Sequence, residues 1–415
     1  MIESSQHGND GAARGGNRRN VAILRIVWAA VFGLMAIAAP QFSRAQMTFN
    51  PYVDARVEHD SNVFRAPNSA TLLASNGDAT LGDTDERYVA GLNGNYLWGL
   101  QQLTAQLEGR HQEFNHYSDL NHSEYLADVS LNWKLTRLLD GLFDFRQERA
   151  MAPFALDNSN QLTINVDRTI SGKMNVNVSP DWRVETGLYS HTLHAPLRGY
   201  PDFVERDLGS HLALDHVGTS DLTYGLAFDR IDGKLEEAPN VGPFTQNSVQ
   251  LTLKYSASAL TKLNAAAGYS RRDQTSTNGS SASAFTGNLG YTRQLTGKTS
   301  VNLQLVRAVN TYVAAGASEI DTTATAGLNW QATYKLAVAA SFSITHSAFV
   351  GQAVPGSNAD GRVDRLPSQL LSVNYQALRR LLLQASFNHQ TRSSNVDLFT
   401  FNDTTYGIEA RWTFL

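Results

Sequence analysis

Apolar and polar side chains alternate along the chain from Phe49 to its end, and the spacing of an amphipathic helix is nearly absent. Between positions 162 and 178, apolar side chains occupy the even positions, interrupted only by Arg168 and Gly172, whereas the odd positions are polar. Residues 404–414 repeat the pattern. A period of two predicts strands with one apolar face and one polar face.

Marking every such run predicts about 18 strands, with 16 as the alternative count, since an even number is required if both chain ends lie on one side of a barrel. The predicted spans are 52–64, 87–98, 102–117, 123–135, 140–150, 162–179, 182–194, 204–216, 221–232, 245–256, 261–273, 283–294, 299–312, 320–333, 336–349, 366–377, 381–392 and 404–414. The predicted fold class is all-β, a transmembrane antiparallel up-and-down β-barrel.

The connections between these strands alternate in length. The short ones carry Gly, Pro, Asp, Ser or Lys and span 99–101, 179–181, 217–220, 257–260, 295–298 and 333–335. The long ones are polar and span 65–86, 195–203, 233–244, 274–282, 350–365 and 393–403. Short periplasmic turns and longer extracellular loops are typical of bacterial barrels, so the alternation predicts which end of each strand faces the outside.

Every tryptophan after the first 45 residues lies beside a short connection or at the chain end. These residues are Trp98, Trp133, Trp182, Trp330 and Trp412, and Phe414 follows the last of them. An indole at a membrane interface buries its ring and keeps its N–H hydrated, so the six side chains are predicted to form a periplasmic aromatic girdle. A soluble β-sandwich, the alternative that alternation alone leaves open, would scatter them through its core.

The first 45 residues have the layout of a secretory signal peptide. Four arginines precede or begin the apolar run 26–39, and the small-x-small ending Ser43-Arg44-Ala45 follows Pro40. The apolar run is short for a transmembrane helix, which needs about 20 residues, although an uncleaved signal anchor is the alternative. The sequence therefore predicts a signal peptide over residues 1–45, cleaved after Ala45, and an outer-membrane barrel over residues 46–415.

Composition narrows the function further. The chain of 415 residues has a formal net charge of -4, so it lacks the basic excess that would neutralise nucleic-acid phosphates. It contains no cysteine, which excludes thiolate metal ligands, cysteine nucleophiles and disulfides. A mean hydropathy of -0.29 is compatible with a barrel, because only every second strand residue must be apolar.

If the apolar face of each strand meets lipid, the opposite face lines the interior. The charged candidates for a solute path there are Asp54, Arg56, Glu58, Glu108, Arg110, Asp144, Arg146, Glu148, Arg183, Glu185, Glu409 and Arg411. They are interpreted either as paired charges that stiffen the interior or as a constriction that selects a polar solute. The first and last strands must pair to close a barrel, so their charges are expected to lie near each other. Many Asn, Gln, Ser and Thr side chains share this face and would suit a carbohydrate.

The sequence predicts no catalytic residue, no metal site and no cofactor. His191 and His194 lie three apart on one strand and point to opposite faces, and the histidines between positions 111 and 122 lack supporting carboxylate spacing. Ser190 and His191 are neighbours on a strand and face opposite ways, which does not suit a hydrolase, and no G-x-S-x-G motif or phosphate-binding loop occurs.

Four short motifs resemble those of the EpsL-type exopolysaccharide biosynthesis barrels, a group akin to the β-barrel porins. They are Asp60-Ser61-Asn62-Val63-Phe64-Arg65, then Tyr117-Ser118-Asp119-Leu120-Asn121 followed by Trp133, then Pro180-Asp181-Trp182, and Arg392-Ser393-Ser394-Asn395-Val396. The resemblance extends over nearly all of the mature chain, and it implies an outer-membrane component of a polysaccharide locus that passes the polymer outward. It implies no substrate-contacting residues.

The leading hypothesis is thus an outer-membrane channel that takes part in polysaccharide export. Its alternatives are a solute uptake porin and a plugged structural barrel. The expected partners are outer-membrane lipid, a polysaccharide or other polar solute, periplasmic export components, and the barrel-assembly machinery, which would recognise the C-terminal strand. No nucleic acid is expected as a partner.

Overall fold

The computed structural model describes residues 46–414 except 156–159, 197–202, 219–220, 237–241, 276–280, 313–316 and 352–358, so the predicted signal peptide lies outside the described residues. The strands are β1 (Gln46–Asp60), β2 (Asp83–Trp98), β3 (Gln101–Phe114), β4 (His122–Lys134), β5 (Leu139–Met151), β6 (Ile164–Ser179), β7 (Trp182–His194), β8 (Val204–Val217), β9 (Leu222–Glu236), β10 (Phe244–Ser258), β11 (Thr261–Gln274), β12 (Ala282–Thr296), β13 (Thr299–Tyr312), β14 (Ala317–Gln331), β15 (Leu336–Val350), β16 (Val363–Leu378), β17 (Leu381–Ser394) and β18 (Phe401–Thr413). The helical segments are α2 (Ser69–Asn76), η2 (Ser118–Leu120) and η4 (Asp397–Phe399). None of these described helices is long and apolar enough to cross a membrane.

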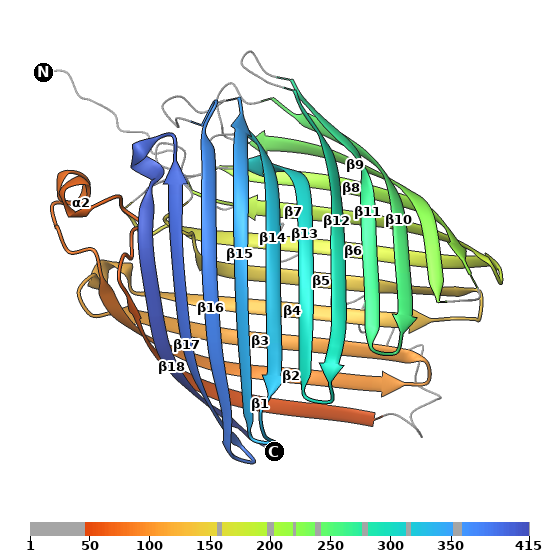
Figure 1. Ribbon diagram of the computed structural model, residues 1–415, viewed down its shortest axis with the longest axis horizontal. Helices are drawn as coiled ribbons and strands as arrows, with labels where there is room; N and C mark the ends of the chain where they lie inside the picture. Colours follow the sequence, from red (N-terminus) through yellow and green to blue (C-terminus); the bar gives the residue numbers. More distant parts are fainter. Residues whose placement is uncertain are drawn as a thin grey trace, which may run out of the picture.

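Each strand pairs antiparallel with its neighbours in sequence, and β1 pairs with β18 to close the sheet into a ring. The closing register joins Tyr52 to Thr413 and Asp60 to Thr405. Figure 1 shows the two ends of the sequence, β1 and β18, side by side in the wall. Closure leaves no strand edge unpaired in the hydrocarbon layer, where backbone amides have no water to bond. The predicted 18-stranded antiparallel barrel is confirmed.

The first strand differs most from its predicted span. It begins at Gln46 rather than residue 52, and residues 46–51 pair with β2 alone, because β18 ends opposite Tyr52. Pro51 lies in this stretch with a single neighbouring strand, which is where a strand tolerates a residue without an amide hydrogen. The backbone N–H of Phe414 donates to the Pro51 carbonyl at 2.8 Å and tethers the chain end there.

Large apolar side chains cover the outer surface of the ring. Leu188, Leu251 and Ile408 are among the most exposed, although each lies in the middle part of a regular strand. Such exposure would be costly in water but is what a lipid-facing band requires. The five tryptophans lie at the ends of β2, β4, β7, β14 and β18 that adjoin short turns or the chain end, and their role as an interfacial girdle stays a prediction.

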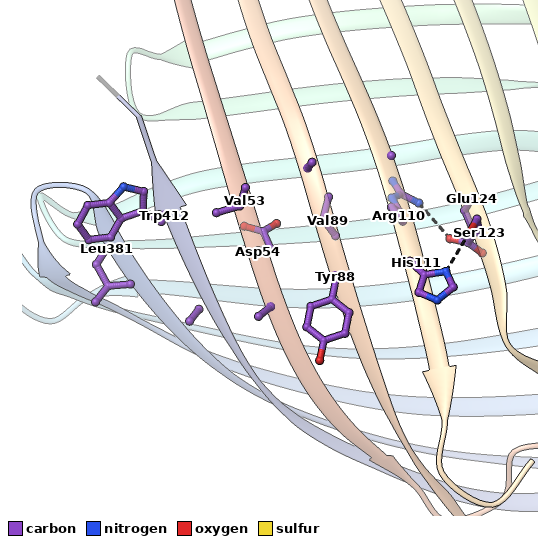
Figure 2. Close-up of a pocket in the computed structure, with 14 residues that line it drawn as sticks. Val53, Asp54, Tyr88, Val89, Arg110, His111, Ser123, Glu124, Leu381 and Trp412 are labelled. Atoms are coloured by element: carbon purple, nitrogen blue, oxygen red, sulfur yellow. Dashed lines mark hydrogen bonds and ion pairs between the residues drawn. The ribbon is translucent and has the colours of Figure 1, made fainter. Parts of the chain in front are cut away.

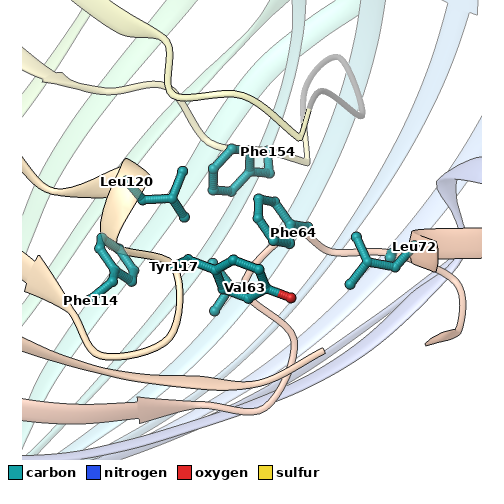
Figure 3. Close-up of a cluster of buried hydrophobic side chains, with 8 residues drawn as sticks. Val63, Phe64, Leu72, Phe114, Tyr117, Leu120 and Phe154 are labelled. Atoms are coloured by element: carbon teal, nitrogen blue, oxygen red, sulfur yellow. The ribbon is translucent and has the colours of Figure 1, made fainter. Parts of the chain in front are cut away.

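Buried apolar side chains instead gather at the end of the barrel that carries the long loops. Phe64 contacts Tyr117 and Phe154 with ring centroids 4.7 and 4.9 Å apart, and Leu72 of α2 joins the same cluster. Figure 3 shows side chains from three separate connections meeting there. The loop between β1 and β2, whose helix was not predicted, is thus anchored onto its neighbours. Asn68 caps α2 by accepting from the Thr71 N–H at 2.9 Å.

A polar contact ties the same loops together above the membrane. The Asp78 carboxylate lies 2.6 Å from Nε2 of His116, and it also accepts from the Thr80 backbone N–H at 2.8 Å. The Thr80 backbone bond and the His116 imidazole lower the pKa of Asp78 to about 2. The carboxylate therefore stays charged, and the contact persists, well into the acid range.

Candidate functional site: the inner wall

Directly paired residues of an antiparallel ladder project to the same face, so the register defines the inner wall. Asp54 pairs with Arg411 on one side and with Val89 on the other, and Val89 pairs in turn with Arg110. This row fixes the inward face of each strand, and every second residue of the strand shares that face. All twelve charged candidates therefore lie on the inner face. Figure 2 shows Arg110 pointing away from its outward-facing neighbour His111. Their contribution to a solute path stays a prediction.

The seam between the first and last strands brings five candidates together. The Arg411 guanidinium donates to both Asp54 carboxylate oxygens at 2.8 Å, and it lies over the ring of Tyr52 at 4.7 Å. Arg411 also lies 3.5 Å from Glu409. Two residues beyond Asp54 on β1, the Arg56 guanidinium forms an ion pair with the Glu58 carboxylate. Two parallel hydrogen bonds fix the geometry of an arginine–carboxylate pair more firmly than a single contact does.

A second group links β1 to β3 across the intervening strand. The Tyr52 hydroxyl donates to Glu108 of β3 by passing over Gly91 of β2, where a Cβ would overlap the tyrosine ring. Glu108 also accepts from Arg110 at 2.7 Å, and Arg110 reaches Glu148 at 3.2 Å. This network extends over strands β1 to β5 of the wall.

Most of the remaining candidates pair with side chains that had not been singled out as site residues. Arg183 lies 2.7 Å from Asp215, and Glu185 lies 2.7 Å from Lys173. Arg146 contacts Asp128 at 3.1 Å and Glu148 at 2.7 Å. Asp144 faces the same side between its register partners Ser130 and Ser171. The candidates thus form several separate groups rather than a single ring.

Charge is distributed unevenly round the wall. On β18 and β1 to β9 the inward carboxylates are Asp54, Glu58, Asp60, Asp83, Asp85, Glu108, Glu124, Asp128, Asp140, Asp144, Glu148, Asp167, Glu185, Glu205, Asp207, Asp215, Asp229, Asp403 and Glu409, whereas the inward Lys and Arg side chains are Arg56, Arg87, Arg110, Lys134, Arg146, Lys173, Arg183 and Arg411. Carboxylates clearly outnumber cationic side chains, so this part of the wall is acidic.

At mid-height the facing part of the wall is built mainly from neutral hydrogen-bonding groups, because its inward charges lie toward the strand ends. These charges are Lys254, Lys262, Arg272, Glu319, Asp321, Asp364 and Arg392. Across β10, β11 and β12, the hydroxyls of Ser248, Ser270 and Thr286 form a chain with spacings of 2.8 and 2.7 Å. Thr323 and Thr345 continue the pattern on β14 and β15 at 2.9 Å. The interior therefore presents an acidic wall opposite a wall of hydroxyl and amide groups.

Accessibility changes along the interior. The inward side chains of Arg146, Lys173 and Asp167 keep 51%, 51% and 50% of their area exposed, although each lies well inside a strand. At the end carrying the long loops, by contrast, inward Arg272 and Arg362 are only 1% exposed. The described residues thus line an interior that is accessible at mid-height and densely packed toward the extracellular end.

The packed end contains an alternating stack of arginine and phenylalanine side chains. The Arg362 guanidinium lies 3.8 Å from the ring centre of Phe349 and 4.0 Å from that of Phe399, and Arg392 lies 4.8 Å from that of Phe401. Cation–π contacts of this kind strengthen when water is excluded. Sequence reasoning did not find the stack, because its members come from loops and strand ends where alternation carries no information.

Arg392 also reaches the connection that follows β5. Its Nη1 donates to the Ala155 carbonyl at 2.7 Å, although β17 and β5 are not neighbours in the ring. Phe154, beside Ala155, belongs to the cluster of Figure 3. The segment after β5 therefore folds inward over the extracellular opening.

The histidines lie in separate environments. His191 sits on the inner wall between Asp167 at 3.3 Å and Asp207 at 3.5 Å, whereas His194 is on the outer face of the same strand. His122 contacts Glu124 at 3.0 Å. In the part of the chain that the structure describes, no group of three or more potential ligands is arranged to hold a metal ion.

Replacing Gly91 with Val should destabilise the barrel by about 1–3 kcal/mol, because the new side chain would displace Tyr52 from Glu108. Gly109 on β3 provides the control, since a Cβ there meets no atom within 4 Å. The thermal midpoint of the detergent-solubilised protein should fall for Gly91→Val and hold for Gly109→Val. An equal midpoint for the two variants would show that the Tyr52 bridge contributes nothing.

A closed ring of strands, apolar outside and charged within, defines a porin-like β-barrel of the bacterial outer membrane. Residues 247–414, less than half of the chain, match the family model described as "Putative beta-barrel porin 2". No curated protein sequence matches the chain.

Two solved structures are similar to the chain at low sequence identity. One is OpdK of Pseudomonas aeruginosa, crystallised with vanillate, with a TM-score of 0.46, 9% identity, and coverage of 88% of this chain and 99% of that chain. The other is a BenF-like porin from Pseudomonas fluorescens Pf-5, with a TM-score of 0.46, 8% identity, and coverage of 90% of this chain and 99% of that chain.

Proposed function

We propose that the protein is a diffusion channel for small polar solutes, with a preference for cationic and neutral solutes over anions. The observation that carries this proposal is the accessible, charged mid-height wall around Arg146, Lys173 and Asp167. In a barrel that served only as a structural element, a packed interior would contribute more stability than half-exposed ionic side chains do. The family description of a β-barrel porin supports the same conclusion.

The packed extracellular end favours small solutes over a polymer. Arg392 and Ala155 connect separate parts of the opening, and a polysaccharide chain could pass only if that contact and the aromatic cluster separated. Polysaccharide export is the second candidate, because the neutral wall of Ser, Thr, Asn and Gln offers the donors and acceptors that sugar hydroxyls bind. No catalytic step is proposed for either function.

Swelling of proteoliposomes distinguishes these candidates. Vesicles containing the purified protein should swell in monosaccharide and in amino acid solutions, with rates that fall steeply as the solute becomes larger. At equal size, a cationic solute should enter faster than an anionic one, because the acidic wall attracts it. Rates equal to those of empty vesicles would exclude the channel. Retention of extracellular polymer inside a deletion strain, combined with no swelling by monosaccharides, would favour export instead.

A further inference from the structure

Four polar side chains form a row on the outer surface, across strands β13 to β16. Arg307 pairs directly with Thr322, Thr322 with His346, and His346 with Arg365. Because direct partners lie side by side, the four residues stand at one height on neighbouring strands, over roughly 14 Å. Arg307, His346 and Arg365 are exposed.

The row lies at the extracellular edge of the apolar band. A second row of direct partners, Thr299, Trp330 and Val338, crosses the same strands near the short turns. Along each strand, eight residues separate this row from the polar row. Eight residues rise about 26 Å along a strand, or about 20 Å across the membrane at a tilt near 40°. The outward residues in between include Leu305, Ala324 and Ile344. The row is therefore at the depth of the outer-leaflet headgroups.

No carboxylate balances this row. The outward positions of β12 to β18, strands that the structure describes throughout, carry no Asp or Glu, and the adjoining segments 313–316 and 352–358 contain none in their sequence. Asp360, in the described part of the β15–β16 connection, accepts from the Gly351 backbone N–H at 2.9 Å. Arg307 donates only to oxygens of uncharged groups in the described structure, Thr322 Oγ1 at 2.6 Å and the Phe285 carbonyl at 3.1 Å.

Two outward arginines elsewhere on the barrel are balanced by carboxylates, whereas Arg149, Arg168 and Arg293 face outward without an ion pair in the described structure. Arg230 lies 2.8 Å from Asp232, and Arg271 lies 3.0 Å from Asp273, on β9 and β11. Balanced pairs of this kind are ordinary features of a barrel surface near the headgroups. Arg307 and Arg365 differ from these residues because they stand in a single row at one height with His346 between them, so a counter-charge from outside the chain could bind several of them at once.

We propose that Arg307, His346 and Arg365 bind phosphate groups of a glycolipid in the outer leaflet of the outer membrane. A guanidinium matches a phosphate with two parallel hydrogen bonds and is more weakly hydrated than an ammonium. The apolar band immediately below the row would hold the acyl chains of the same lipid. This site is on the outside of the barrel, so it is independent of the channel.

Native mass spectrometry of the detergent-solubilised mature protein tests the site with lipid A as the probe. Bisphosphorylated lipid A should remain bound, and chemically dephosphorylated lipid A should bind at least tenfold more weakly. Arg307→Gln combined with Arg365→Gln should weaken binding of bisphosphorylated lipid A by a similar factor. Competition by millimolar inorganic phosphate should be slight, because the acyl chains also contribute; full displacement by phosphate alone would identify a free anion site and overturn the lipid assignment.

The matched control is Arg230→Gln combined with Arg271→Gln, which removes two outward arginines that already have carboxylate partners. Binding by this control should equal that of the wild type. Equal binding by the Arg307/Arg365 variant, or equal binding of the dephosphorylated lipid, would refute the proposal. Heat-modifiable migration on a gel reports whether each variant has folded, and Arg307→Lys with Arg365→Lys preserves the charge if the glutamine variant does not fold.

Discussion

Under a tenfold KCl gradient across a planar bilayer, the channel current should reverse at a potential whose sign marks potassium as the more permeant ion. Its magnitude should lie between zero and the limit of about 59 mV for a perfectly selective monovalent pore. The reason is the excess of inward carboxylates on β18 and β1 to β9, set in a low-dielectric wall that focuses their field. A preference for potassium of roughly three- to tenfold is expected.

Neutralising accessible carboxylates should weaken this preference. Asp128, Asp167 and Asp229 face inward, keep between a third and a half of their side-chain area exposed, and lie on separate strands. Their simultaneous replacement by Asn keeps the size of each side chain and leaves Arg146, His191 and His211 without these partners. The reversal potential should then move toward zero.

Asp232→Asn is the control for that measurement, because Asp232 is equally exposed but lies on the outer face of β9, paired with Arg230. It should leave the reversal potential unchanged. Anion selectivity of the wild-type channel, or a triple variant that behaves as the wild type does, would contradict an acidic solute path. Raising the salt concentration should weaken the preference, since the Debye length falls to about 3 Å at 1 M.

The sequence predicted the strands because one physical requirement acts on every second residue. The even positions of β6, for example Ile164 and Val166, face the lipid, whereas Asp167 faces the accessible interior, so the chain alternates between apolar and polar residues. The pairing of the first and last strands was also predictable, because a ring can close in only one place. The contact between Asp54 and Arg411 follows from that closure together with a register that the sequence alone did not supply.

The packed extracellular end could not be predicted in the same way. Arg362, Phe399 and Arg392 come from loops and strand ends, and their contacts depend on how separate connections fold over one another. Length alone identified 65–86 as a long loop but did not indicate α2 or its contact with Phe154. The outer row of Arg307 and Arg365 emerged only once the register had placed four strands in order.

Replacing Asp54 with Ala should lower the free energy of unfolding by about 2 kcal/mol. The Asp54 side chain is 4% exposed and forms two hydrogen bonds with Arg411, which is 38% exposed, so the loss should fall between that of a surface ion pair and that of a buried one. The pair also joins residues 357 positions apart, at the junction where the two ends of the sequence close the ring.

Urea unfolding in phospholipid vesicles, followed by tryptophan fluorescence, measures this loss as a shift in the midpoint at constant slope. Asp128→Ala is the matched control, because Asp128 also pairs with an inward arginine, Arg146, but the pair is open to water and should contribute less than about 0.5 kcal/mol. Asp54→Asn should recover part of the loss by keeping one acceptor for Arg411. Equal shifts for Asp54→Ala and Asp128→Ala would mean that the closing seam is no stronger than any exposed ion pair of the wall.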